Sequence, residues 1–250
     1  MWRGGSYVEI FRTGCSDDPD VPEHVRGLYG RSCEGLEEVE CAKLKELIIK
    51  YEAVFSKSEW DLGHYQDIKF KIDTGDARPV KQRMRRTPLG FVDEEKAFLE
   101  NLLAQGIIEI ATSEWASPSV LVRKKDGGVR WCVDYRRLNS VTVKDSYPMP
   151  IIEECVDALA GSRYFSTLDL ASGFYQIEVA EEDRDKTAFL TKYGLFRFVR
   201  MPFGLTNAPA IFGRVMTSVL RGLLWEDAVA FLDDVMVSGA SFDDHLCKLE

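Results

Sequence analysis

Long apolar runs, cysteine motifs and internal repeats are all missing from this 250-residue sequence. No stretch approaches the roughly 18–20 apolar residues that a membrane-spanning helix needs, and the Trp2-Arg-Gly-Gly start lacks the apolar centre of a signal peptide. We therefore expect an intracellular protein without membrane contact. The six cysteines and three histidines form no Cys-x-x-Cys pair and no metal-type spacing. This scatter indicates reduced thiols rather than a zinc site or a disulfide framework.

An overall excess of positive charge is missing too. The chain has 32 Lys and Arg against 41 Asp and Glu, a net charge of −9, which argues against a general nucleic-acid binder. The balance is uneven, however: −6 over residues 1–76, +5 over 77–144 and −8 over 145–250. A basic block between two acidic ones is typical either of a phosphate-contacting surface or of a solvated charged face.

Strands and helices alternate without a regular βαβ rhythm, which predicts an α+β fold with a mainly antiparallel sheet. Residues 1–31 lack periodicity and suggest a linker or extended tail. Apolar periodicity predicts helices over residues 36–55, 91–105, 151–160 and about 206–224, with another beginning near 241. Short apolar or alternating runs predict strands over residues 68–72, 107–110, 119–125, 129–133, 163–168, 176–179, 187–191 and 195–199.

The stretch Ala228–Ser238 places two adjacent carboxylates, Asp233 and Asp234, between two apolar runs of strand length. This pattern predicts a β-hairpin with the acids at its tip, although Asp-Asp is not a favoured turn pair. Asp169 likewise ends an apolar strand. If the two strands are neighbours, three carboxylates converge and would suit Mg²⁺. Two such ions can clamp the attacking and leaving oxygens of a phosphoryl transfer. Otherwise the acids form a solvated turn.

Asp73-Thr74-Gly75 matches the short signature of an aspartic protease. Such a protease needs a second aspartate that shares one proton with the first, and a small apolar residue after the glycine. Asp76 stands there instead, so the pattern favours a strand-ending turn, with the protease as a distant alternative.

Ordered motifs along the chain resemble the reverse transcriptase of gypsy-type LTR retrotransposons, part of a retroviral-like Pol polyprotein. The resemblance covers about residues 21–250. It rests on Trp115–Pro118, Lys124–Gly127, Cys132–Arg136 with Leu138-Asn139, Tyr147–Pro150, Phe165–Leu170 with Ser172-Gly173, Lys186–Phe189, Met201–Leu205 with Asn207–Pro209, and Phe231–Asp234.

The resemblance implies a right-hand polymerase fold that adds deoxynucleotides to a primer on an RNA or DNA template. Residues 1–66 would be an acidic N-terminal linker and helix, and 67–144 the basic fingers. Residues 145–250 would form an incomplete palm, with a return to the fingers at about 180–204. By comparison with the family, the sequence stops before the thumb, ribonuclease H and integrase, which we expect as partners from the same polyprotein. The resemblance also implies the cytoplasm, within virus-like particles, with the nucleus as an open alternative.

The family's catalytic and metal-binding roles transfer to Asp169, Asp233 and Asp234, with the carbonyl of Leu170 beside one of two Mg²⁺ ions, for which Mn²⁺ can substitute. Lys124 or Lys125 and Arg130 match the cations that hold the triphosphate of the dNTP. Phe174 matches the aromatic gate that excludes a ribose 2′-OH. The remaining residues implied near the dNTP or the template–primer are Phe203, Asn207, Pro209, Phe231 and Leu232.

Three departures from the family pattern stand out: Phe231 replaces a commoner Tyr, Phe174-Tyr175 replaces Tyr-His, and Gly213 stands where relatives usually carry Gln. A glycine inside a helix costs about 0.5–1 kcal/mol relative to Ala. The change at Gly213 and the missing thumb keep a second hypothesis open, in which the chain is a catalytically inactive nucleic-acid-binding remnant.

Overall fold

A computed structural model of the chain describes residues 18–58, 60–123 and 129–250. The chain folds into two units and crosses between them more than once. The two units are described separately below. The first unit comprises Met1–His64, Tyr147–Gly173 and Phe212–Glu250, and the second comprises Tyr65–Ser146 and Phe174–Ile211.

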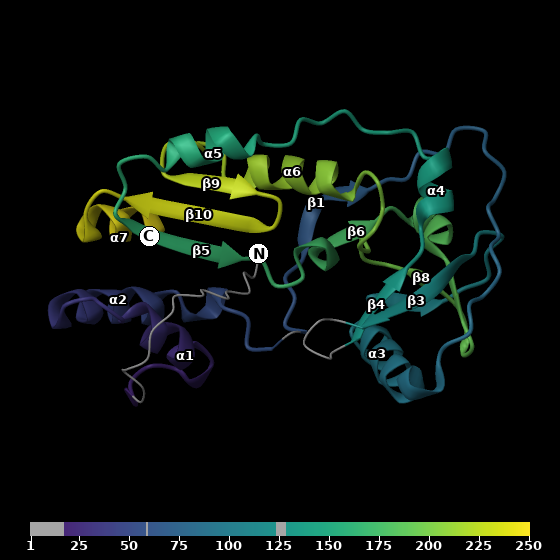
Figure 1. Cartoon of the computed structure of the whole chain (residues 1–250), viewed down its shortest axis with the longest axis horizontal. Helices are drawn as coiled ribbons and strands as arrows, with labels where there is room; N and C mark the ends of the chain where they lie inside the picture. Colours follow the sequence, from purple (N-terminus) through teal and green to yellow (C-terminus); the bar gives the residue numbers. More distant parts are fainter. Residues whose placement is uncertain (1–17, 59, 124–128) are drawn as a thin grey trace. The chain divides into compact units, whose positions relative to one another are not determined.

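A three-stranded antiparallel sheet is the centre of the first unit (Figure 1). Its order is β5 (Tyr164–Asp169), β10 (Asp234–Gly239) and β9 (Ala228–Phe231). Val235 and Val237 are buried, and the predicted hairpin and its partner strand are confirmed. The sheet's helical neighbours are α5 (Ile152–Ala158) beside β9 and α7 (Phe242–Leu249) beside β10.

Helix α6 (Ala208–Val219) begins in the second unit and continues in the first. Its start is as the Thr206/Asn207 capping pattern predicts, whereas its end comes before the predicted 224. Leu220 and the residues after it form turns, and Gly222 has a positive φ of 87°. The left-handed backbone at this glycine ends the helical path.

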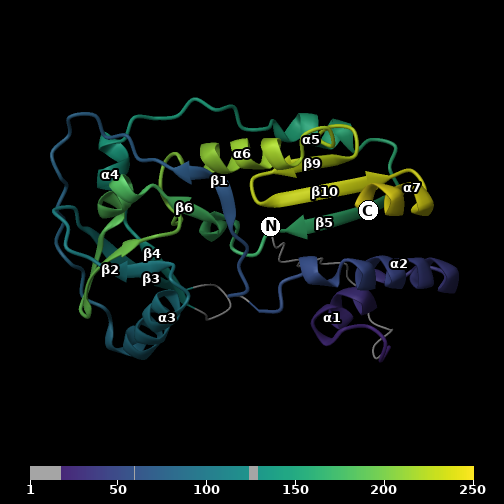
Figure 2. The same cartoon turned by 180° about the vertical axis from the view of Figure 1, so that it is seen from behind.

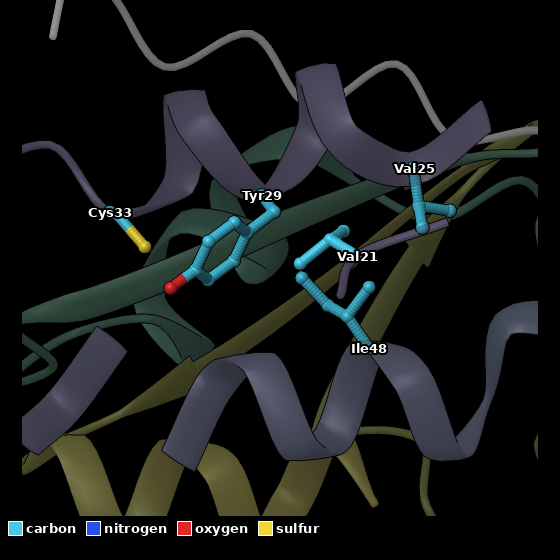
Figure 3. Close-up of a cluster of buried hydrophobic side chains, with 5 residues drawn as sticks. All are labelled: Val21, Val25, Tyr29, Cys33 and Ile48. Carbon is cyan, nitrogen blue, oxygen red and sulfur yellow. The ribbon is translucent and has the colours of Figure 1, made fainter. Parts of the chain in front are cut away.

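Residues 1–31 are not all a linker, so that prediction is wrong for its last third. The chain forms α1 (Glu23–Ser32), which packs on α2 (Glu38–Lys50). The 3₁₀ turn η1 (Glu52–Val54) follows α2 in the chain. Figure 3 shows the cluster between these helices. Val25 and Tyr29 lie one helical turn apart on α1, and the face that they share is buried against the partner helix α2. The cluster comprises Val21, Val25, Tyr29, Cys33 and Ile48.

The N-terminal helices are tied to the end of the chain within the first unit. Lys43 Nζ donates to Asp243 Oδ1 at 2.6 Å, and Lys50 pairs with Glu250. Each ion pair joins α2 to a residue 200 positions later in the chain. Helices α2 and α7 lie next to one another in Figures 1 and 2. Exposed ion pairs contribute at most about 1 kcal/mol each, so they orient α2 more than they stabilise it.

Two sheets make up the second unit. The larger has the order β2-β8-β7-β3-β4, with β3 and β7 parallel and the other pairs antiparallel; β1 and β6 form a parallel pair. The strands of the second unit are β1 (Tyr65–Phe70), β2 (Ile108–Ile110), β3 (Ser117–Arg123), β4 (Val129–Val133), β6 (Ile177–Val179), β7 (Phe189–Thr191) and β8 (Gly194–Phe198). Its helices are η2 (Leu89–Phe91), α3 (Val92–Ala104), α4 (Arg136–Val141), η3 (Gly173–Gln176, whose first residue belongs to the first unit) and η4 (Glu181–Thr187).

Aromatic side chains form the core of the larger sheet. The Trp131 ring lies 5.4 Å from Phe98 of α3, 5.0 Å from Phe189 and 6.5 Å from Phe198, measured between ring centroids. Tyr135 is 2% exposed, and its hydroxyl donates to the Thr187 carbonyl at 2.8 Å. Strand β4 and the start of α4 are therefore anchored in this core.

The Asp73-Thr74-Gly75 pattern forms a turn shortly after β1. The Asp73 Oδ1 accepts a 2.9 Å hydrogen bond from the Gly75 amide, and Gly75 has a positive φ of 49°. The carboxylate is thus engaged in its own turn. In the part of the chain that the structure describes, no helix has the length and apolar character needed to cross a membrane.

Candidate active site

Asp169 and Asp234 lie directly opposite each other across two neighbouring strands. Asp169 is the last residue of β5 and Asp234 the first of β10, and their Cα atoms are register partners. Just beyond this pair, the Leu170 amide donates to the Asp233 carbonyl at 3.2 Å. The backbone therefore brings all three predicted aspartates to one end of the sheet, the end at which β10 turns into β9 (Figure 2).

The hairpin turn consists of Leu232 and Asp233, because Phe231 and Asp234 are paired as the last and first strand residues. The prediction of both acids at the tip is thus wrong by one residue. Leu232 has a φ of 56°, in the left-handed region where a two-residue hairpin normally has glycine. A leucine there is strained by about 1–2 kcal/mol. Strain of this kind clusters at functional sites.

Burial and like charge both act on Asp169. Partial burial, followed by the charges of Asp233 and Asp234, raises the pKa of Asp169 from its ordinary 3.8 to about 6. The rise has the direction expected for a carboxylate that is partly buried beside two others. Carboxylate and carbonyl oxygens are also the donors that Mg²⁺ prefers. The donor set therefore fits a hard divalent cation.

The side-chain positions themselves are not a ready-made metal cluster. Within residues 18–58, 60–123 and 129–250, no three His, Cys, Asp or Glu side chains are gathered closely enough to hold a metal ion. The convergence of Asp169, Asp233 and Asp234 is thus one of backbone position and electrostatics.

Gly173 allows the chain to leave β5 close to α6. A Cβ atom at this position would lie 2.8 Å from Cζ of Phe212, closer than real Cβ atoms approach. Ser172, directly before it, has a φ of 44°. The Ser-Gly pair therefore makes a tight exit from the Asp169 strand that a larger side chain would block.

Gly213 has a packing partner that the sequence did not reveal. A Cβ atom there would come within 3.1 Å of the Tyr147 ring, whose hydroxyl hydrogen-bonds Thr217 Oγ1 at 2.7 Å. Arg214 also lies 4.8 Å from the centre of the same ring. Gly213 thus leaves room for Tyr147 on α6, which gives the unusual glycine a structural reason.

Of the predicted triphosphate-binding cations, Lys124 and Lys125 lie outside the described residues. The structure describes Arg130 only in its backbone, which pairs with Val122 in the antiparallel hairpin of β3 and β4. The hairpin that the Asp-Gly pattern predicts is confirmed, while the contacts of its cations stay a prediction.

The two predicted aromatic residues of the nucleotide pocket lie against each other in the second unit. The Phe174 and Phe203 rings are stacked, with centroids 4.9 Å apart and an interplanar angle of 25°. Phe174 is 8% exposed and Phe203 is 48% exposed. Tyr175 adds an edge contact to Phe203 at 5.5 Å. Phe203 therefore presents the exposed ring and Phe174 lies beneath it.

Asn207, predicted near the template or primer, uses both ends of its amide within the protein. Its Nδ2 donates to the Val143 carbonyl at 2.7 Å, and its Oδ1 accepts from the Asp145 amide at 3.0 Å. Pro209 follows in the first turn of α6, where its missing amide costs no helical hydrogen bond. Asn207 thus has a structural role that its motif alone did not indicate.

Asn139 is a residue of this region whose role the residue pattern did not suggest. Its Nδ2 donates to the Gly204 carbonyl at 2.8 Å, and its Oδ1 accepts from the Thr206 amide at 3.0 Å. Asn139 lies in α4, a helix too short to show apolar periodicity. Its place in the Leu138-Asn139 motif was the available signal.

The predicted site is divided between the two units. The first unit holds the three aspartates, Leu170 and the partly buried Phe231 and Leu232, whereas the second holds Arg130, Phe174, Phe203 and Asn207.

Comparisons with known proteins identify relatives of this chain. The Pol polyprotein of transposon 297 of Drosophila melanogaster is 36% identical over 220 residues, which are 86% of this chain and 21% of that protein. The Pol polyprotein of transposon gypsy from the same organism is 36% identical over 214 residues, 83% of this chain and 21% of that protein. The chain thus spans about a fifth of the length of these relatives.

A solved structure shows the same fold. The foamy viral protease–reverse transcriptase in complex with an RNA/DNA hybrid matches with a TM-score of 0.82 and 23% identity, covering 96% of this chain and 32% of that chain. The architecture is therefore the α+β fingers-and-palm architecture of a right-hand polymerase, with an antiparallel palm sheet.

The sequence model of the family described as "Reverse transcriptase (RNA-dependent DNA polymerase)" matches residues 122–250, slightly more than half of the chain. The chain belongs to the reverse transcriptase family, and its relatives are the Pol polyproteins of gypsy-type transposons.

Proposed function

We propose that this chain is the fingers and palm of an RNA-directed DNA polymerase, which adds deoxynucleotides to a primer 3′-OH on an RNA or DNA template. The observation that carries the proposal is the register pairing of Asp169 with Asp234 beside Asp233. The first unit, apart from its N-terminal helices, would be the palm, and the second unit the fingers.

Asp169, Asp233 and Asp234, with the Leu170 carbonyl, would hold two Mg²⁺ ions, for which Mn²⁺ can substitute. Bound in pairs, such ions neutralise charge on the attacking and leaving oxygens of a phosphoryl transfer. The protein's own contribution is to hold three anionic groups at one strand end, where burial and the two neighbouring carboxylates raise the pKa of Asp169. Leu232, with its left-handed backbone, and Asp233 form the two-residue turn between β9 and β10.

The nucleotide would be bound by residues of the second unit. Arg130, with Lys124 or Lys125, would hold the triphosphate through charge-assisted hydrogen bonds. Phe174 would exclude the ribose 2′-OH, the group that separates ribonucleotides from deoxynucleotides. Phe203, half exposed above Phe174, would pack near the base and sugar.

The template–primer would lie along the basic block and the strand ends. Residues 77–144 carry a charge of +5, which suits contacts to phosphate groups. Phe231 and Leu232 at the hairpin, and Pro209 in the first turn of α6, would contact the primer and template. The foamy viral relative of the same fold was solved with an RNA/DNA hybrid, which supports this class of ligand. Such a polymerase would work in the cytoplasm, within virus-like particles.

Primer extension tests the proposal. The substrate is poly(rA)/oligo(dT) with dTTP and Mg²⁺. Two proteins are compared: the 250-residue chain, and a longer protein in which this chain replaces the matching segment of the gypsy Pol polyprotein. We expect dTMP incorporation by at least the longer protein, and its loss in Asp233→Asn, because the substitution removes an anionic ligand without changing the size of the side chain.

The matched control is Asp243→Asn, which removes an exposed carboxylate of the first unit that pairs with Lys43. This variant should incorporate dTMP at the unsubstituted rate. Equal activity of Asp233→Asn and the control would overturn the catalytic assignment. A longer protein that binds the primer–template but never extends it would instead favour the inactive nucleic-acid-binding remnant.

A further inference from the structure

The Phe174–Phe203 stack gives the sugar-selecting surface two rings instead of one. Phe174 is almost fully buried, and the ring that covers it, Phe203, is 48% exposed. Offset or parallel stacking at 4.9 Å restrains both rings, because each limits the rotation of the other. The orientation of Phe174 therefore depends on where the loop of residues 201–207 holds Phe203.

That loop has little regular structure of its own to hold it. Residues 201–207 form no helix or strand, and Gly204 has a positive φ of 90°. A Cβ atom at Gly204 would be only 3.7 Å from the Tyr135 ring and from the Val133 carbonyl, so the loop passes close over the end of β4. A loop of this kind keeps one conformation only if its polar groups are paired.

Asn139 supplies the pairing on one side of the loop. Its single amide group bonds the Gly204 carbonyl at 2.8 Å and the Thr206 amide at 3.0 Å, so it spans the three residues that follow Phe203. The backbone of α4 holds Asn139 in turn, because the backbone N–H of Asn139 donates to the Tyr135 carbonyl at 2.7 Å. Asn139 is thereby tied to a residue that is itself buried in the core.

Asn207 supplies a second and reciprocal pairing. It reaches from the loop back to the Val143 carbonyl and the Asp145 amide, just beyond α4. The two segments thus exchange asparagine side chains, each of which satisfies one backbone donor and one backbone acceptor of the other segment. Two such clamps define the distance between α4 and the loop.

We infer that Asn139 is a positioning residue for sugar discrimination: it holds the 204–206 backbone, which sets Phe203 on Phe174 and so fixes the ring that meets the nucleotide 2′ position. This inference rests on the proposed function, because it takes Phe174 and Phe203 to face an incoming nucleotide. It adds that selection against ribonucleotides is a property of the clamped ring pair.

The test compares incorporation of dGMP and rGMP on one defined primer–template, with the longer protein described above. We expect Asn139→Ala and Phe203→Ala each to lower the preference for dGTP over rGTP by about tenfold, the effect of roughly one lost packing or hydrogen-bonding interaction. Asn139→Asp keeps the acceptor for Thr206 but not the donor for Gly204, and should give an intermediate preference. The control is Ser140→Ala in the same helix, whose hydroxyl bonds only the Arg137 carbonyl among the described contacts.

A purely structural role for Asn139 would slow both nucleotides equally and leave the preference unchanged, which would overturn the inference while the polymerase assignment stands. An unsubstituted protein that incorporates neither nucleotide would overturn the proposed function, and this inference with it. Hydrogen exchange gives a readout that needs no activity. In the 250-residue chain the Thr206 amide should exchange faster in Asn139→Ala than in Ser140→Ala, and equal rates would show that the clamp does not hold the loop.

Discussion

Asp169 and Asp234 are register partners at the ends of two antiparallel strands, although 64 residues of chain separate them. Strand pairing alone brings them together, since side chains of directly opposed residues lie about 4.5–5.5 Å apart at Cβ. Asp233 joins them through the Leu170–Asp233 backbone hydrogen bond. The acidic edge is therefore a property of the sheet register, and any shift of β5 along β10 by one residue would separate it.

Replacement of Leu232 tests the strain in the hairpin turn. Leu232→Val places a β-branched side chain in the left-handed region, which tolerates it even less than leucine, and should reduce the free energy of unfolding. Leu232→Gly tolerates this φ, so relief of strain should offset most of the lost side-chain packing. Urea unfolding of the two variants checks the difference. If both lose the same stability, the turn does not hold Leu232 in this conformation.

Gly239 makes a close approach that a single methyl group should disrupt. A Cβ atom there would lie 2.6 Å from the backbone nitrogen and Cα of His245, so Gly239→Ala should cost about 1–3 kcal/mol through overpacking between β10 and α7. Gly27→Ala is the control: it lies inside α1 with only ordinary contact at 3.6 Å, and should add about 0.5–1 kcal/mol through helix propensity. Thermal or urea unfolding that ranks the two variants in the opposite order would contradict the packing of α7.

His245 should make the first unit less stable in mild acid. The side chain is 5% exposed and its Nε2 hydrogen-bonds Ser166 Oγ at 2.8 Å. Burial lowers the pKa of His245, against the attraction of Asp244 and with the repulsion of Lys248. Because the folded pKa lies below the unfolded value of 6.5, the stabilisation is complete above pH 6.5. It is lost as the pH falls through 6.5 towards the folded pKa.

Urea unfolding between pH 7.5 and 5 measures this effect. Protonation of Asp169, whose pKa is raised from 3.8 to about 6, stabilises the folded chain over the same interval, so the expected result is a difference between two proteins. Relative to pH 7.5, the unsubstituted chain should fare worse in acid than His245→Gln, which cannot take up the proton. Equal changes in stability would show that another group carries the pH dependence.

Local patterns predicted most elements, because strands and helices with clear apolar periodicity declare themselves in short windows. The hairpin of β9 and β10, the strand that ends at Asp169 and helix α3 all follow from such patterns. Helix α1 was missed because its burial depends on a partner helix, and its apolar residues are few. The parallel pairs β1–β6 and β3–β7 depend on long-range contacts that no local window contains.

The candidate site, too, has features that local patterns predict and features that depend on long-range contacts. The identities of Asp169, Asp233 and Asp234 could be predicted from strand-end carboxylates and from the family motifs. Which residue occupies the strained turn position could not, since a leucine in the left-handed region contradicts local preference. The clamps of Asn139 and Asn207 were also missed, because side-chain bonds to a distant backbone leave no periodic signal.

Divalent-ion binding by the 250-residue chain tests most directly whether the acidic strand ends form a metal centre. Titration with Mn²⁺, followed by the electron paramagnetic resonance signal of the free ion, should show binding to the unsubstituted chain and to Asp243→Asn. Asp169→Asn should bind at least tenfold more weakly, because one of three neighbouring charges is lost. Equal Mn²⁺ affinity in all three proteins would contradict the assignment of Asp169, Asp233 and Asp234 as the polymerase metal site.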